Sequence, residues 1–70
     1  MIVSDIYMMC DNIKPGATFH LYRKSSNYVN KEMPWKVGTY YDLGEGDYLL
    51  CDVSSFLIED NGHTVHVRIL

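Results

Sequence analysis

Apolar positions near the start of the chain recur at the spacing of an α-helix. They form one stripe made of Ile2, Ile6, Met9 and Ile13. Successive members are four, three and four residues apart, which places them on one face of a helix. Ser4 is a favourable N-cap, and Asp5 suits the positive end of the helix dipole. Because Pro15-Gly16 ends the pattern, the sequence predicts a helix over residues 4–13.

From residue 17 onward the period changes to two, as in a β-strand. One side carries Ala17, Phe19 and Leu21, and the other carries Thr18, His20 and Tyr22. A second alternation follows Pro34, which lacks an N–H and belongs at the start of a strand. In this second strand, one side carries Trp35, Val37 and Thr39, and the other carries Lys36, Gly38 and Tyr40. The polar stretch 24–32 predicts a hairpin loop, so we expect these two strands to pair.

The last third of the chain contains turn signals and a hairpin. Residues 42–47, DLGEGD, predict a turn, and residues 47–51, DYLLC, predict a single helical turn capped by Asp47. Asn61-Gly62 is the preferred pair for a two-residue type I′ turn. Such a turn pairs Asp60 with His63, Glu59 with Thr64, Ile58 with Val65, and Phe56 with Val67.

This register separates the hairpin into two faces. The apolar face consists of Phe56, Ile58, Val65, Val67 and Ile69. The polar face consists of Glu59, Thr64, His66 and Arg68, with Leu57 as the exception. Because the turn chemistry and the alternation agree, the hairpin is internally consistent.

Together these elements predict a single α+β domain over residues 1–70. One N-terminal helix packs on one face of a four-stranded, mainly antiparallel sheet that ends in a β-hairpin. The alternative architecture is a small, partly open β-barrel. The expected core is Ile6, Met9, Ile13, Phe19, Leu21, Trp35, Val37, Phe56, Ile58, Val65, Val67 and Ile69.

Composition narrows the classes of protein. Seventy residues, 47% of them hydrophobic, suit one small folded domain, and six Lys/Arg against nine Asp/Glu give a net charge of −3. These values exclude a two-domain enzyme and a strongly basic DNA-coating protein. With no signal-peptide pattern and no long apolar run, we expect a cytoplasmic protein without a membrane partner. Cys10 and Cys51 are then expected to be reduced thiols.

The candidate chemistry is sparse, and we expect neither an enzyme nor a bound cofactor. A zinc site needs closely spaced ligand pairs, but the two cysteines are isolated. His63 and His66 would point to opposite faces of a strand, so no metal site is expected. Cys10 has no context that would lower its thiol pKa, and Ser54-Ser55 has no nucleophile motif.

The six tyrosines and one tryptophan exceed what a small core can cover. The outer face of the predicted sheet carries His20, Tyr22, Lys36, Tyr40, His66 and Arg68. Such residues suit either a protein interface or the stacking of single-stranded nucleic acid. The negative net charge favours a protein partner over nucleic acid, although a local basic patch is expected from Lys14, Arg23, Lys24 and Lys31.

Four motifs resemble those of small, uncharacterised phage and prophage accessory proteins. They are Val3-Ser4-Asp5-Ile6, Pro15-Gly16-Ala17-Thr18, Trp35-Lys36-Val37-Gly38 and Asn61-Gly62. The resemblance implies an inhibitor of a host defence effector, similar to an anti-CRISPR, that acts in the host cytoplasm. An acidic segment could then mimic nucleic-acid charge through Asp42, Glu45, Asp47 and Asp52. Two alternatives remain. One is a module that binds single-stranded nucleic acid, and the other is a structural subunit that assembles into a homo-oligomer.

Overall fold

The fold is that of a computed structural model, in which the structure describes residues 1–23 and 34–70. The predicted loop at 24–32, together with Lys24 and Lys31 of the predicted basic patch, lies outside these residues. The helices are α1 (Val3–Met9) and α2 (Tyr40–Leu43), with short 3₁₀ turns η2 (Tyr48–Leu50) and η3 (Asp60–Gly62). The strands are β1 (Thr18–Tyr22), β2 (Lys36–Thr39), β3 (Val53–Glu59) and β4 (Thr64–Ile69).

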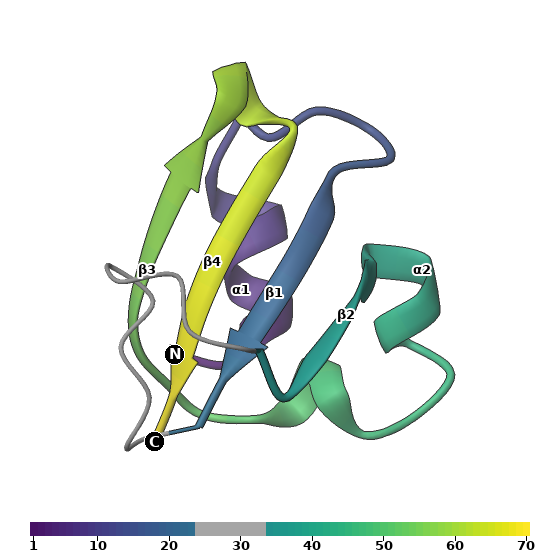
Figure 1. Ribbon diagram of the computed structural model, residues 1–70, viewed down its shortest axis with the longest axis vertical. Coiled ribbons are helices and arrows are strands. Elements are labelled where there is room, and N and C mark those ends of the chain that lie inside the picture. The colour runs from purple at the N-terminus through teal and green to yellow at the C-terminus, as the bar shows by residue number, and fades with distance from the viewer. Residues whose placement is uncertain (24–33) are drawn as a thin grey trace.

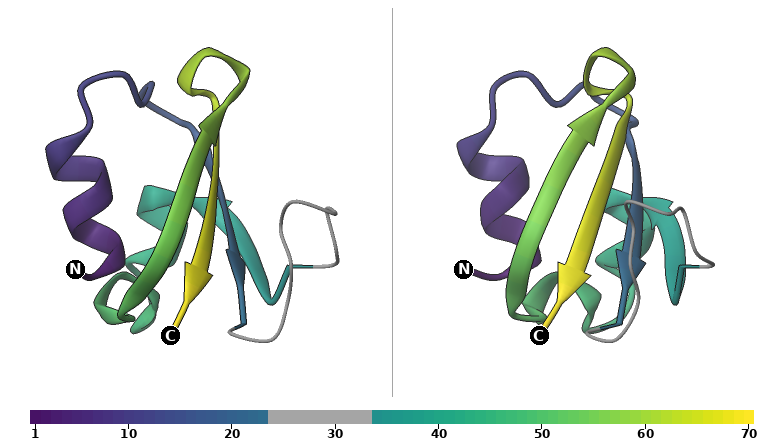
Figure 2. Two further views of the ribbon diagram at one scale, coloured as in Figure 1. Left: turned by 90° about the vertical axis from the view of Figure 1, so that its left-hand side faces the viewer. Right: turned by 60° about the vertical axis from the view of Figure 1, so that its left-hand side comes forward.

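The four strands form one open mixed sheet in the order β2-β1-β4-β3 (Figure 1). The outer pairs β1–β2 and β3–β4 are antiparallel, whereas the central pair β1–β4 is parallel. The helix α1 lies against one side of the sheet, which is seen edge-on in Figure 2. The predicted α+β class is therefore confirmed, and the sheet does not close into a barrel. No helix in residues 1–23 or 34–70 has the length and apolar character to cross a membrane.

The first helix starts and ends earlier than predicted. Ile2 rather than Ser4 occupies the N-cap, and the carboxylate of Asp5 accepts a hydrogen bond from the Ile2 N–H at 2.9 Å. The helix ends at Met9, so the expected stripe does not continue at helical spacing to Ile13. The residues that pack on the core are instead Val3, Ile6, Tyr7 and Cys10.

The core lies between the sheet and the helical layer. Its buried apolar residues are Val3, Ile6, Ile13, Ala17, Phe19, Leu21, Leu43, Val65, Val67 and Ile69. Phe56 and Ile58 pack against it while partly buried. The predicted core placement is wrong for Met9, Trp35 and Val37, which are exposed. Val3, Ile6, Tyr7 and Cys10 follow the spacing of one helical face, and Met9 lies outside that face.

The error at β2 comes from its register. His20 pairs with Val37, and Leu21 pairs with Lys36. Paired residues share a face of the sheet, so Val37 lies on the outer face while Lys36 lies on the helix side. The strand is also shorter than predicted, because the chain turns into α2 at Tyr40. The predicted helical turn near residue 47 is confirmed as η2, but Asp47 makes no side-chain capping bond there.

The C-terminal hairpin has the predicted strand register. Phe56 pairs with Val67, Ile58 with Val65, and Glu59 with Thr64. Asn61 and Gly62 have φ values of +55° and +91°, and the His63 N–H donates to the Asp60 carbonyl at 3.0 Å. However, Asp60 also has a positive φ of +54°. Strand pairing therefore stops at Glu59–Thr64, and the connection is longer than a two-residue loop.

Candidate functional site

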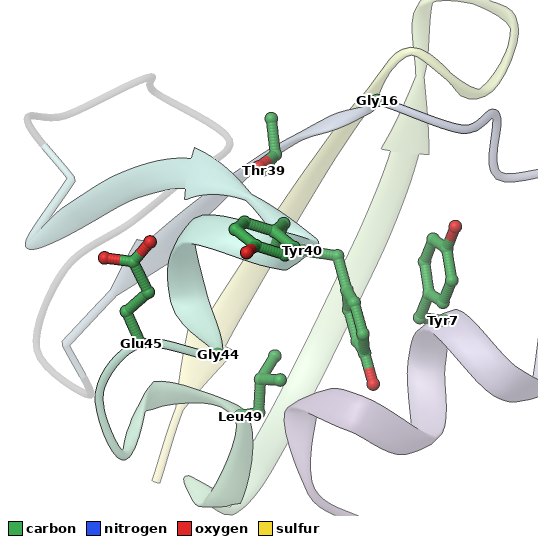
Figure 3. A pocket seen from close by; sticks show the side chains of 8 residues that line it. Tyr7, Gly16, Thr39, Tyr40, Gly44, Glu45 and Leu49 are labelled. Atoms are coloured by element: carbon green, nitrogen blue, oxygen red, sulfur yellow. The ribbon is translucent and has the colours of Figure 1, made fainter.

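A tyrosine-lined pocket opens on the helix side of the molecule. Its volume is about 610 Å³, and it lies open to solvent. Figure 3 shows Tyr7 from α1 at one side and Glu45, which follows α2, at the other. The described residues that line it are Tyr7, Gly16, Thr39, Tyr40, Tyr41, Gly44, Glu45 and Leu49. We call this surface the tyrosine pocket.

The turn from β2 into α2 positions two of the three tyrosines. Thr39 is the N-cap of α2, and its hydroxyl oxygen accepts from the Asp42 N–H at 3.2 Å. The Asp42 carboxylate accepts in return from the Thr39 N–H at 3.0 Å. This reciprocal capping box fixes the direction of a helix that is only four residues long. Tyr40 consequently reaches the helix side, and Tyr41 is left 80% exposed.

Aromatic contacts hold one wall of the pocket. The rings of Tyr7 and Tyr40 are stacked, with centroids 4.2 Å apart and planes 20° apart. Phe19 in the core supports both, with ring centroids 6.4 Å from Tyr7 and 6.3 Å from Tyr40. A wall that is supported by the core loses little conformational entropy when a ligand binds to it.

The pocket has one charged side chain among the described residues that line it, which is Glu45. Within residues 1–23 and 34–70, its carboxylate does not take part in an ion pair. The pKa of the nearby Asp42 is lowered by the backbone hydrogen bond from Thr39 and then by the Thr39 side chain. Asp42 is therefore ionised at neutral pH.

The six residues predicted to form one interface do not share a face. His20, Tyr22, His66 and Arg68 lie on the outer face of the sheet, because His20 pairs with His66 and Tyr22 pairs with Arg68. Lys36 lies on the helix side, where its ammonium is 5.0 Å from the Tyr48 ring centroid. Tyr40 is also on that side, in the tyrosine pocket. This placement corrects the expected composite surface.

The outer face is instead organised by a buried polar network. The Tyr22 hydroxyl and Nδ1 of His66 are 2.8 Å apart, and Nε2 of His66 is 2.7 Å from Glu59. Burial, and then the charge of Glu59, raises the pKa of Tyr22. Burial, and then repulsion by His66, lowers the pKa of His20. Because Tyr22 is only 2% exposed, its ring is not available to stack on a nucleic-acid base.

The four predicted acidic residues occupy different environments, although all are exposed. Asp42 caps α2, and Glu45 lines the tyrosine pocket. Asp47 precedes η2, and its carbonyl accepts from the Leu50 N–H at 3.1 Å. Asp52 forms an isolated bridge with Ile2. Of the four, Glu45 is the one that belongs to the tyrosine pocket.

Sequence reasoning missed Tyr7, Tyr41 and Leu49 as site residues. The available signal was the high tyrosine content. These side chains lie close together only because the chain turns at Thr39, whereas the alternating pattern predicts that the strand continues to Tyr40. Among the described residues, no group of three or more His, Cys, Asp or Glu side chains is placed to hold a metal ion. Cys10 and Cys51 are free and half-buried. Comparison with family models, curated proteins and solved structures finds no match.

Proposed function

We propose that the chain is a non-enzymatic binding module that uses the tyrosine pocket to contact a partner protein. The observation that carries the proposal is the cluster of tyrosines around an open pocket, in which Tyr7 and Tyr40 are half-buried against the core and Tyr41 is exposed. Tyrosine is enriched at protein interfaces, because its ring offers a large contact area and its hydroxyl remains polar. The helix α1 also exposes Met8 and Met9, and methionine suits adaptable contact surfaces.

A protein partner accounts for the pocket better than the other ligand classes. A small-molecule site encloses most of its ligand, whereas this pocket lies open to solvent. Nucleic acid needs a positive field, but Glu45 lines the pocket and the chain carries a net charge of −3. An open pocket with aromatic walls fits a side chain that projects from a partner surface.

The more specific proposal is an inhibitor of a host defence effector, encoded by a phage or another mobile element. It rests on the four sequence motifs that resemble phage accessory proteins. It places the protein in the cytoplasm, where Cys10 and Cys51 would remain reduced. Mimicry of nucleic acid would depend on Glu45 together with the other exposed carboxylates of residues 42–52.

Affinity capture from the cells that express the protein tests the general proposal. The bait is used as wild type, as Tyr41→Ala, and as Leu57→Ala, which changes an exposed apolar residue on another element. We expect one protein to be retained equally by wild type and Leu57→Ala, and at least about tenfold less by Tyr41→Ala. Circular dichroism confirms that each bait is folded.

Three outcomes contradict the proposal. The first is that no protein is retained by the wild-type bait. The second is that the retained protein is insensitive to Tyr41→Ala. The third is that retention is lost on nuclease treatment, which would favour the nucleic-acid alternative.

A further inference from the structure

We propose that the tyrosine pocket is specific for an arginine side chain of the partner. This inference rests on the proposed function and deepens it, since it names the chemical group that the pocket recognises. Two features line it: the side chains of Tyr7, Tyr40 and Tyr41, and the acidic side chain of Glu45. A guanidinium group can use both at once, because it stacks on aromatic rings and pairs with a carboxylate.

Among the residues that the structure describes, neither feature has a cationic partner. Within residues 1–23 and 34–70, the cation–π pairs are Arg23 with Trp35, at 4.8 Å, and Lys36 with Tyr48, at 5.0 Å. Neither pair uses a tyrosine of the pocket. The contact between Nε2 of His66 and the carboxylate of Glu59 lies on the outer face and does not use Glu45. Among the described residues, the pocket therefore presents a carboxylate without an ion-pair partner and tyrosine rings without a cation–π contact, which together are complementary to a cation.

The form of the pocket favours arginine over an apolar or lysine side chain. Tyr7 and Tyr40 are already stacked on each other, so the ligand meets a supported aromatic wall rather than a gap between separate rings. Figure 3 shows Glu45 on the side of the pocket away from Tyr7. A planar guanidinium can lie along an aromatic surface and still direct N–H groups sideways to a carboxylate. A compact ammonium lacks this planar shape, and an apolar group would leave Glu45 unpaired.

A peptide titration followed by backbone amide chemical shifts tests the inference on the full chain. The probe is the tripeptide acetyl-Gly-Arg-Gly-amide, and its neutral control replaces arginine with citrulline, which has nearly the same shape. Low ionic strength is used because salt screens exposed charges. We expect the arginine probe to shift amides in residues 39–49 and to bind about fivefold or more tightly than the citrulline probe.

Two protein variants of equal net charge distinguish binding at the tyrosine pocket from a general attraction to an acidic protein. Glu45→Gln changes a residue of the tyrosine pocket, whereas Asp47→Asn changes an exposed carboxylate that lines a different pocket beside Trp35. We expect Glu45→Gln to weaken arginine binding about threefold or more and Asp47→Asn to leave it within a factor of about 1.5. Both variants alter exposed side chains, so dispersed amide spectra are expected for both.

The inference is overturned if citrulline binds as tightly as arginine, if both variants weaken binding equally, or if no amide of residues 39–49 shifts. The capture experiment decides the proposed function separately. If a partner is lost with Tyr41→Ala but arginine does not bind, the protein-binding function stands and the arginine specificity is wrong. If arginine binds but no partner is captured, the specificity stands and the protein-binding function fails.

Discussion

Substitution of Gly62 by alanine tests how the C-terminal hairpin is attached to the rest of the fold. Gly62 has a φ of +91° in the turn between β3 and β4. A Cβ atom at this position would lie 1.9 Å from the Asn12 carbonyl oxygen. The two groups would have to separate by about 1 Å, to at least 3.0 Å, before the contact became acceptable. Gly62→Ala therefore forces the hairpin turn away from the segment that follows α1.

Gly16→Ala is the matched control, because Gly16 also has a positive φ, of +80°, but nothing lies within 4 Å of the position that the new methyl group would occupy. Its cost is the backbone strain alone, about 1 kcal/mol. Gly62→Ala adds the displacement of the Asn12 backbone and weakens the hydrogen bond from the Lys14 N–H to the Gly62 carbonyl, which is 2.9 Å long. It also disturbs the buried Ile13. We expect a total loss of about 3 kcal/mol in the free energy of unfolding.

Equilibrium urea unfolding of the two variants measures this difference, with far-UV circular dichroism as the signal. A loss of about 2 kcal/mol between them corresponds to a difference in Tm of about 8–16 °C for a domain of this size. Equal stability of Gly62→Ala and Gly16→Ala would refute the close contact between the turn and Asn12.

Three further predictions concern the polar network and the core. Tyr22→Phe removes the hydroxyl that lies 2.8 Å from His66 and should lower the free energy of unfolding by about 1 kcal/mol. The control Tyr41→Phe, at an exposed site, should change the free energy of unfolding by less than about 0.5 kcal/mol. Equal effects of the two substitutions in urea unfolding would contradict the network. Leu43→Ala leaves a cavity at a fully buried site and should lower the free energy of unfolding by about 2–5 kcal/mol. Leu50→Ala, at an exposed site, should lower it by less than about 1 kcal/mol. A small effect of Leu43→Ala on the free energy of unfolding would contradict the role of α2 in the core. Because the pKa of His20 is lowered in the folded state, the unfolded chain binds the proton more readily, so stability should fall as the pH drops below about 6.5. Urea titrations between pH 8 and pH 5 should show a smaller decline in the free energy of unfolding for His20→Gln than for the wild type. If the two declines are equal, the pH dependence of stability arises from other groups.

The parts of the fold that were predictable from sequence depend on local signals. The register of β3 and β4 follows from a short turn, because alternation and turn chemistry act within a few residues of each other. The parallel pairing of β1 with β4 joins strands that are far apart in the sequence, and no local pattern specifies it. The alternation around Val37 predicts the wrong face, because short strands have weak periodicity and the partner register decides which side is buried.

The candidate site was less predictable than the fold. The sequence indicated an excess of tyrosine, but it did not indicate which tyrosines would meet. Tyr40 looked like the end of a strand, although Thr39 and Asp42 are spaced as a capping box and start a helix there. That turn moves Tyr40 to the side of α1 and brings it against Tyr7. Recognition of the capping box was therefore the missing step.

Site-specific photo-cross-linking tests most directly whether the tyrosine pocket is the binding surface. A benzophenone amino acid is placed at position 41, or at position 57 as the control, and the cells that express the protein are irradiated. We predict one discrete adduct with a partner protein from position 41, which is weaker when Glu45→Gln is added, and no such adduct from position 57. Adducts from position 57 alone, or the same adduct from both positions, would contradict the assignment of the interface to the tyrosine pocket.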